Sequence, residues 1–149
     1  AHLRSLEEGL AITWCQQSAE QPGFDTASVD LVASHWLFHE MPPHAIRNCL
    51  RETRRVLRPG GVFMAYDMYL LPGGAIGRWL HAGYAARNNE PYAYSYAAMD
   101  MRRELELTGF GSVAVYFGVS PQEANIKNGT ILRAYHDQVP FGTAKGYVP

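Results

Sequence analysis

The chain has 149 residues, of which 47% are hydrophobic and 18% are charged, and its formal net charge is -1. This composition predicts one domain with a buried core and excludes a disordered chain. The near-neutral charge argues against a nucleic-acid-binding surface, and no apolar run is long enough to cross a membrane.

The first part of the chain predicts a helix, a strand and a loop. Residues 2–8 are typical of the last turns of a helix, which Gly9 ends because glycine adopts the left-handed conformation. Residues 10–16 contain β-branched and aromatic side chains and predict a short strand. The polar stretch 18–28 includes a Pro-Gly pair and predicts a loop.

The middle of the chain predicts a strand-helix-strand unit. Residues 29–34 predict a strand, and two prolines precede a helix over residues 44–57. The apolar side chains of that helix recur at spacings of three, four and seven, which places them on one face. The sequence Pro59-Gly60-Gly61 ends the helix. The apolar run 62–69 lacks strict alternation, which predicts a strand covered on both faces.

The last part predicts helices followed by two strands. Residues 76–86 predict a helix, 87–94 a loop, and Ser95 a cap for a second helix that runs to about residue 108. Residues 112–118 and 130–136 predict strands with no helix between them. The alternation of strands and helices predicts a parallel sheet with helices on both faces, and the last two strands an antiparallel pair at one edge.

Three segments carry a family signature. They are residues 17–24, 29–42 and 52–63, and the last contains Leu57-Arg58-Pro59-Gly60-Gly61. In order and spacing they resemble the class I S-adenosylmethionine-dependent methyltransferases, in particular the type 11/12-like methyltransferase domains. They match the loop after the family's strand 3, its strand 4, and its helix-turn-strand 5 unit.

The resemblance implies S-adenosylmethionine as the cofactor. It assigns Ser18, Ala19 and Glu20 to the loop that meets the adenine, where Ser18 replaces the usual aspartate. A hydroxyl can accept the same hydrogen bond, but without the assistance of charge. The resemblance also places Ser34 and His35, at the end of the family's strand 4, beside the methionine portion of the cofactor.

The family's glycine-rich loop and the acidic residue after its second strand have no counterpart in the sequence. The resemblance therefore implies an α/β, Rossmann-like three-layer methyltransferase fold that lacks its first two strands, with a mostly parallel sheet and an antiparallel edge strand. We expect one incomplete domain: residues 1–70 form the cofactor-side core, 71–109 a helical substrate-covering region, and 110–149 the strand pair and tail. We also expect the 149 residues alone not to bind the cofactor with useful affinity, which a calorimetric titration would test.

Two histidines are candidates for a catalytic base, which is needed only when the methyl acceptor must lose a proton. They are His35 and His39, since histidine titrates near neutral pH, although a structural role is favoured for each. No metal site is expected. A zinc site with His35, His39 and the adjacent Glu40 is the alternative, but the prolines that follow crowd the stretch.

The substrate is expected at the carboxyl edge of the sheet, where ligands of open α/β sheets bind. Asp67 and Tyr69 end a strand there and are candidate substrate contacts, and Asp67 could equally cap a turn. Tyr92 and Tyr94 belong to an aromatic cluster that could enclose an acceptor, with packing within a lid as the alternative.

The reaction expected is methyl transfer to a small-molecule acceptor, which the chain would carry out as part of a larger domain. No nucleic-acid or membrane partner is expected. Both cysteines lie in apolar runs and indicate reduced thiols, which fits a cytoplasmic protein. A truncated or non-catalytic domain that needs another chain is the alternative, because an exposed sheet edge favours self-association. A nicotinamide-dependent oxidoreductase is less favoured, because the glycines at 73, 74 and 77 have the wrong spacing for a dinucleotide loop.

Overall fold

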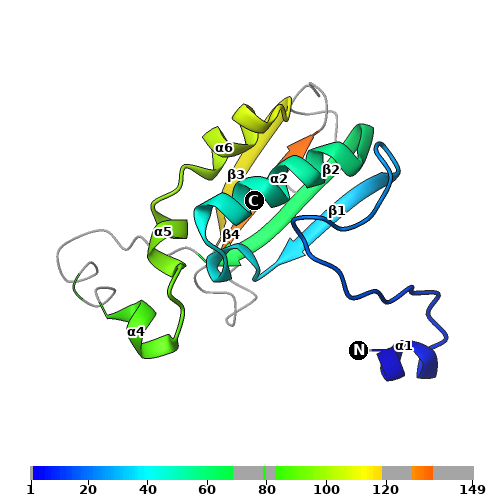
Figure 1. Cartoon of the computed structure of the whole chain (residues 1–149), viewed down its shortest axis with the longest axis horizontal. Coiled ribbons are helices and arrows are strands. Elements are labelled where there is room, and N and C mark those ends of the chain that lie inside the picture. Colours follow the sequence, from blue (N-terminus) through cyan, green and yellow to red (C-terminus); the bar gives the residue numbers. More distant parts are fainter. Residues whose placement is uncertain (1, 69–78, 80–82, 119–128, 136–149) are drawn as a thin grey trace.

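The structure is a computed structural model that describes residues 2–68, 79, 83–118 and 129–135 (Figure 1). Its elements in chain order are α1 (His2–Glu7), β1 (Val29–His35), η1 (Phe38–Glu40), α2 (Pro43–Val56), β2 (Leu57–Met68), α4 (Tyr84–Asn88), α5 (Ala93–Ala97), α6 (Met101–Thr108), β3 (Ser112–Gly118) and β4 (Gly129–Tyr135). The structure thus confirms the predicted helices 2–8 and 44–57 and the predicted strands 29–34, 112–118 and 130–136, with ends that differ by one residue at most within the described part. The strand predicted at 62–69 is also present, but it begins five residues earlier, at Leu57.

Four strands form one sheet in the order β1-β2-β4-β3. Strand β1 is parallel to β2, whereas β4 is antiparallel to both of its neighbours. The α/β class and the antiparallel pairing of the last two strands are confirmed. Strand β4 lies one place in from the edge, and β3 forms the edge itself, so that three strands point one way and one points back.

The turn predicted at Pro59-Gly60-Gly61 lies inside β2 rather than before it. The register between β1 and β2 shifts between Val29 and Leu31, which accommodates the extra residues as a bulge. Gly60 has a φ of 78°, a left-handed conformation that suits glycine. A Cβ atom on Gly61 would lie 2.8 Å from the carbonyl oxygen of Arg58, so this position excludes a side chain.

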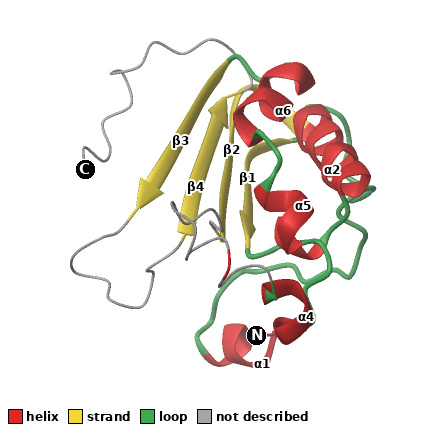
Figure 2. Cartoon of the chain, turned by 90° about the vertical axis from the view of Figure 1, so that its left-hand side faces the viewer, coloured by secondary structure: helices red, strands yellow, loops and turns green. Residues whose placement is uncertain are grey.

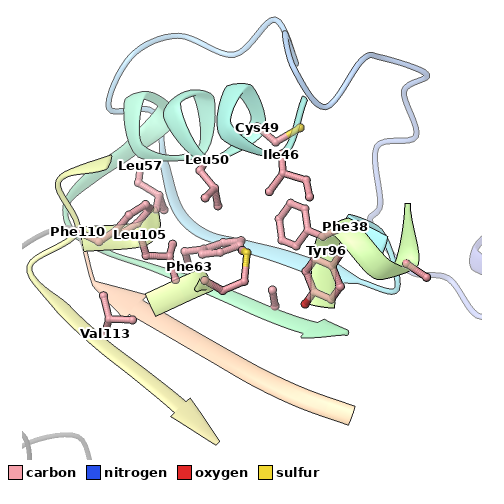
Figure 3. Close-up of a cluster of buried hydrophobic side chains, with 13 residues drawn as sticks. Phe38, Ile46, Cys49, Leu50, Leu57, Phe63, Tyr96, Leu105, Phe110 and Val113 are labelled. Atoms are coloured by element: carbon pink, nitrogen blue, oxygen red, sulfur yellow. The ribbon is translucent and has the colours of Figure 1, made fainter. Parts of the chain in front are cut away.

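Helices α2, α5 and α6 cover one face of the sheet, as Figure 2 shows. The core between them and the sheet contains Phe38, Ile46, Cys49, Leu50, Leu57, Phe63, Ala65, Ala93, Tyr96, Met101, Leu105, Phe110 and Val113 (Figure 3). An ion pair between Arg47 on α2 and Glu104 on α6, 2.7 Å apart, joins the two helices outside this core. Among the residues described, no helix has both the length and the apolar character needed to cross a membrane.

The other face of β1 and β2 is open within the described part of the chain. Leu31 on β1 is 56% exposed and Met64 on β2 is 42% exposed, although both are large apolar residues. The prediction that the strand at 62–69 is covered on both faces is therefore wrong for these residues. Apolar composition alone did not distinguish a side chain packed under a helix from one on the opposite side of the same strand.

The strand predicted at residues 10–16 is also wrong, since no strand forms there. Ile12 and Trp14 are each about half exposed. The indole nitrogen of Trp14 donates a hydrogen bond to the Ser5 hydroxyl, 2.9 Å away. In Figure 1 this segment runs away from the sheet toward α1. Strand propensity needs a hydrogen-bonding neighbour to become a strand, and the described residues offer none beside this segment.

The helical region differs from its prediction in detail. Ser95 does not cap a helix but lies within α5, and the long helix predicted from it is two short ones. Asp100 caps α6 instead: its side chain accepts a hydrogen bond from the Arg103 backbone N–H at 3.0 Å. Gly109 ends α6 with a φ of 95°, as predicted. The helix predicted at 76–86 lies largely outside the described residues.

Candidate functional site at the carboxyl ends of β1 and β2

The parallel strands β1 and β2 end side by side, with His35 paired to Tyr66. Immediately after β1, Trp36 turns the chain with a φ of 52°, which is uncommon for a residue other than glycine. Its backbone N–H donates to the Tyr66 carbonyl at 2.9 Å, and η1 follows. The loop that carries η1 is thereby held against the end of β2.

Asp67 fixes this loop from the neighbouring strand. Its Oδ2 atom accepts hydrogen bonds from the backbone N–H groups of Leu37 at 3.2 Å and Phe38 at 2.7 Å. Its Oδ1 atom lies 2.6 Å from Nδ1 of His39. The residue is only 1% exposed, so these bonds replace the hydration that its carboxylate loses on burial.

His39 is almost completely buried, at 3% exposure, and is surrounded by Asp67, Trp36 and Glu40. Trp36 packs edge-on against its ring, with the centroids 5.4 Å apart. Its Nε2 atom lies 3.5 Å from a carboxylate oxygen of Glu40. If Nδ1–H donates to Asp67, Nε2 carries a lone pair, which is the arrangement of a base or a metal ligand.

A third carboxylate, that of Glu90, reaches His39 from the segment between α4 and α5. One ligand atom from each of His39, Glu40 and Glu90 lies within 4.8 Å of the others. The Oε2 atom of Glu90 is buried and has no hydrogen-bond partner among the described residues. Burial, together with the charge of Glu90 and a hydrogen bond to it, raises the pKa of Tyr84.

Tyr96 on α5 closes the inner side of the site. It is buried, and its burial together with the nearby charge of Asp67 raises the pKa of its hydroxyl. Figure 3 shows its ring beside Phe38 of η1. Helix α5 therefore packs on the same short segment that carries His39 and Glu40.

The other residues predicted for the cofactor lie on β1 and on the loop at 17–24. His35 is exposed and stacks on Tyr66, with the rings 5.3 Å apart and 19° from parallel. The Ser34 hydroxyl is buried with no partner among the described residues. The Ser18 hydroxyl accepts from the Glu20 N–H at 3.2 Å, and the Glu20 carboxylate accepts from Asn48 on α2 at 2.6 Å.

The predicted substrate residues are dispersed. Tyr92 and Tyr94 are exposed at the start of α5, whereas Asp67 is buried. Tyr69 lies outside the described residues.

Sequence reasoning missed Glu90 as a member of the site. Glu40 is adjacent to His39 and was visible as a candidate, but Glu90 is far away in the sequence and lies in a loop without a motif. The two histidines differ in their surroundings: His35 is exposed and stacks on Tyr66, whereas His39 is buried, and both rings lie edge-on to Trp36. The three groups that do converge come from η1 and from the segment between α4 and α5.

Comparison with known proteins gives consistent similarities. Residues 1–65 match the family model described as a methyltransferase domain. An uncharacterized methyltransferase from Synechocystis sp. is 35% identical over 57 residues, which are 38% of this chain and 27% of that protein.

Solved structures share the fold at low sequence identity. One of them is phosphoethanolamine N-methyltransferase 2 from Haemonchus contortus, solved in complex with phosphomonomethylethanolamine and S-adenosylhomocysteine. It superposes with a TM-score of 0.67 at 15% sequence identity, and the match covers 91% of this chain and 40% of that one. A protein from Galdieria sulphuraria assigned as a sarcosine dimethylglycine methyltransferase gives 0.67 at 16% identity, over 92% and 64%. The chain thus spans less than two thirds of the length of each of these relatives.

Proposed function

We propose that the chain is part of a class I S-adenosylmethionine-dependent methyltransferase and that the protein transfers a methyl group from S-adenosylmethionine to a small-molecule acceptor. The match of residues 1–65 to a methyltransferase domain and the shared fold support this. One observation carries the proposal beyond the family. A buried histidine, oriented by a buried carboxylate, lies at the carboxyl ends of β1 and β2. Ligands of open α/β sheets bind at that edge, so the histidine lies next to the place where an acceptor would be held.

When bound, the cofactor supplies an electrophilic methyl group, and we propose that this chain binds and orients the cofactor. The buried Ser34 hydroxyl, one residue before the end of β1, supports this fit. It has no hydrogen-bond partner among the described residues and so has both donor and acceptor capacity to offer. The exposed residues Ser18 and Ala19 are proposed to meet the adenine. We propose that Glu20 supports this adenine-binding loop, since its carboxylate already accepts a hydrogen bond from Asn48 on α2.

His39 is proposed as the base for an acceptor that must lose a proton. Asp67 is proposed to position it, since both carboxylate oxygens of Asp67 are engaged by η1 and His39. His35 remains a second candidate base, and its exposed ring on Tyr66 is better placed to line a binding surface. Tyr92 and Tyr94, both exposed on the segment that packs against η1, are proposed to contact the acceptor.

The test uses the full-length protein, because the chain spans only part of its relatives' length. Calorimetry would measure S-adenosylmethionine binding, and transfer of a labelled methyl group would be followed across amine, hydroxyl and thiol acceptors. For an acceptor that loses a proton, His39→Gln should lower kcat by roughly 10²- to 10⁴-fold and leave cofactor affinity unchanged. Ser34→Ala should weaken cofactor binding.

His44→Gln is the matched control, because His44 is an exposed histidine on α2. It should change neither binding nor turnover. Failure of the full-length protein to bind S-adenosylmethionine would refute the proposal. Equal turnover by wild type and His39→Gln would remove His39 from it.

A non-catalytic domain that pairs with another chain is the second candidate. The open sheet face around Leu31 and Met64 and the edge of β1, which no strand pairs among the described residues, support it. Size-exclusion chromatography of the full-length protein distinguishes the non-catalytic domain from the enzyme, since a stable monomer would argue against a required partner.

The glycine segment 73–77 that suggested a nicotinamide cofactor lies outside the described residues. A cytoplasmic location is proposed with the methyltransferase, in keeping with two free cysteines.

A further inference from the structure

We propose that His39, Glu40 and Glu90 bind a divalent transition-metal ion. The ligand atoms of these three side chains already lie within 4.8 Å of one another. A metal with Zn–N and Zn–O distances of about 2.0–2.2 Å needs only small side-chain movements to contact all three. The residues come from two segments far apart in sequence, η1 and the connection between α4 and α5, so the fold itself brings them together.

His39 is prepared for this role by its other ring nitrogen. Oδ1 of Asp67 lies 2.6 Å from Nδ1, which fixes the ring, and in the tautomer that carries its proton on Nδ1 the Nε2 lone pair is available to a metal ion. The His39 side chain is 4% exposed, and a carboxylate oxygen of Glu40 lies 3.5 Å from its Nε2 atom. A lone pair facing a carboxylate oxygen is unfavourable unless a proton or a metal cation lies between them, and a metal ion would satisfy both groups.

Glu90 supplies the independent observation. Its Oε2 atom is buried and accepts no hydrogen bond from the described residues. The Glu90 carboxylate has a hydrogen bond with Tyr84, but its buried Oε2 atom has no donor among the described residues, and a metal ion would supply that missing interaction. Glu40, whose side chain is 52% exposed, gives the ion a path from solvent. Two carboxylates and a neutral imidazole carry two negative charges, which a divalent ion neutralises.

The donor set indicates the class of metal. One imidazole nitrogen and two carboxylate oxygens suit Zn²⁺, Mn²⁺, Fe²⁺ or Co²⁺ better than Mg²⁺ or Ca²⁺, which prefer oxygen ligands alone. Three protein ligands leave coordination positions for water or for an oxygen of a bound molecule. Resting on the proposed methyl transfer, this assigns acceptors with a metal-binding oxygen as the substrate class. With the ion bound, Nε2 of His39 would be a ligand and not the base, and the ion itself would favour loss of the proton by lowering the pKa of the acceptor oxygen that it binds.

The experiment is a titration of the chelator-treated full-length protein with Co²⁺ and, separately, with Zn²⁺. Co²⁺ reports its ligands by visible absorption, and calorimetry gives the stoichiometry and affinity of Zn²⁺. We expect one ion per chain. Glu40→Gln and Glu90→Gln should each weaken binding by more than about tenfold, as loss of a coordinating group does. Neither substitution changes side-chain size. Glu106→Gln, at an exposed glutamate on α6, should leave affinity unchanged.

Absence of stoichiometric binding, or equal affinity in wild type and the Glu40→Gln/Glu90→Gln double variant, would overturn the proposal. A proton on Nε2 of His39 would then occupy the position assigned to the metal. S-adenosylmethionine binding measured on the same preparation separates the two hypotheses. A protein that binds cofactor but no Co²⁺ refutes the metal site alone, whereas one that binds Co²⁺ but no cofactor refutes the methyltransferase proposal alone.

Discussion

Replacement of Asp67 should destabilise the protein through the loop it holds, and the size of the effect follows from its hydrogen bonds. Asp67→Ala removes the acceptor of two backbone N–H groups, those of Leu37 and Phe38, and of the His39 ring. Each buried donor left without an acceptor costs about 1–3 kcal/mol, so the two backbone groups predict a loss of about 2–6 kcal/mol.

Asp67→Asn refines the same argument, because it retains one oxygen and nearly the same volume. Hydrogen bonds to a charged acceptor contribute about 1.5–3 kcal/mol and neutral ones about 0.5–1.5 kcal/mol, so each weakened backbone bond loses about 1–1.5 kcal/mol and the two together about 2–3 kcal/mol. The amide –NH₂ would then face either the backbone donors or the His39 ring. In the second case His39 must accept at Nδ1 and carry its proton on Nε2, toward Glu40.

Urea unfolding followed by tryptophan fluorescence measures both variants. Asp30→Ala is the control, because Asp30 forms only an exposed ion pair with Arg58 and should cost less than about 1 kcal/mol. The expected order of destabilisation is Asp67→Ala, then Asp67→Asn, then the control. If Asp67→Ala unfolds with the same free energy as Asp30→Ala, the role given to this carboxylate is incorrect.

Three further predictions concern the packing of α2 and α6. Burial, with a smaller contribution from a nearby glutamate, raises the pKa of the Cys49 thiol to about 11. A thiol reagent at pH 8 should therefore modify the exposed Cys15 at once and Cys49 only after unfolding. Equal rates of modification at the two cysteines would contradict this. Leu50→Ala, in the core, should lower the unfolding free energy by about 2–5 kcal/mol, and Leu31→Ala, on the open face, by far less. The hydrogen bond from the α2 arginine lowers the pKa of Glu104 below its usual value near 4.5, so its contribution to stability is present above that value and lost as the pH falls through the lowered pKa. The stability difference between wild type and Glu104→Gln, measured by urea unfolding, should therefore shrink on acidification, and a constant difference would refute the assignment.

The elements that the sequence predicted well are those whose signal is local. Helix α2 shows an apolar stripe, and β1 and β2 are short apolar runs bounded by turn residues. The errors occurred where a distant partner decides the outcome. Residues 10–16 have strand propensity but no strand beside them, and the apolar Met64 lies on a face that no described helix covers. Local pattern carries no information on either point.

The residues of the candidate site also divide into those with a local sequence signal and those that depend on a distant partner. His39 and Asp67 were recognisable because each follows or ends a predicted strand, and parallel strands bring their carboxyl ends together. Their direct contact, and the role of Asp67 as acceptor for η1, depend on the register between β1 and β2. Glu90 joins them only because α5 packs on η1, which no spacing in the sequence encodes.

The position of β4 within the sheet has a consequence for how the chain folds. Strand β3 pairs only with β4 among the described strands, and β4 joins it to β2 by pairing Val62 with Tyr135 and Met68 with Gly129. During synthesis β3 therefore emerges before the strand that will hold it. The sheet closes through contacts of long sequence separation, which form late and slowly because the intervening chain must first be ordered. Until β4 arrives, β2 and β3 each present an unpaired edge, and this is the stage at which the nascent chain is most exposed to aggregation.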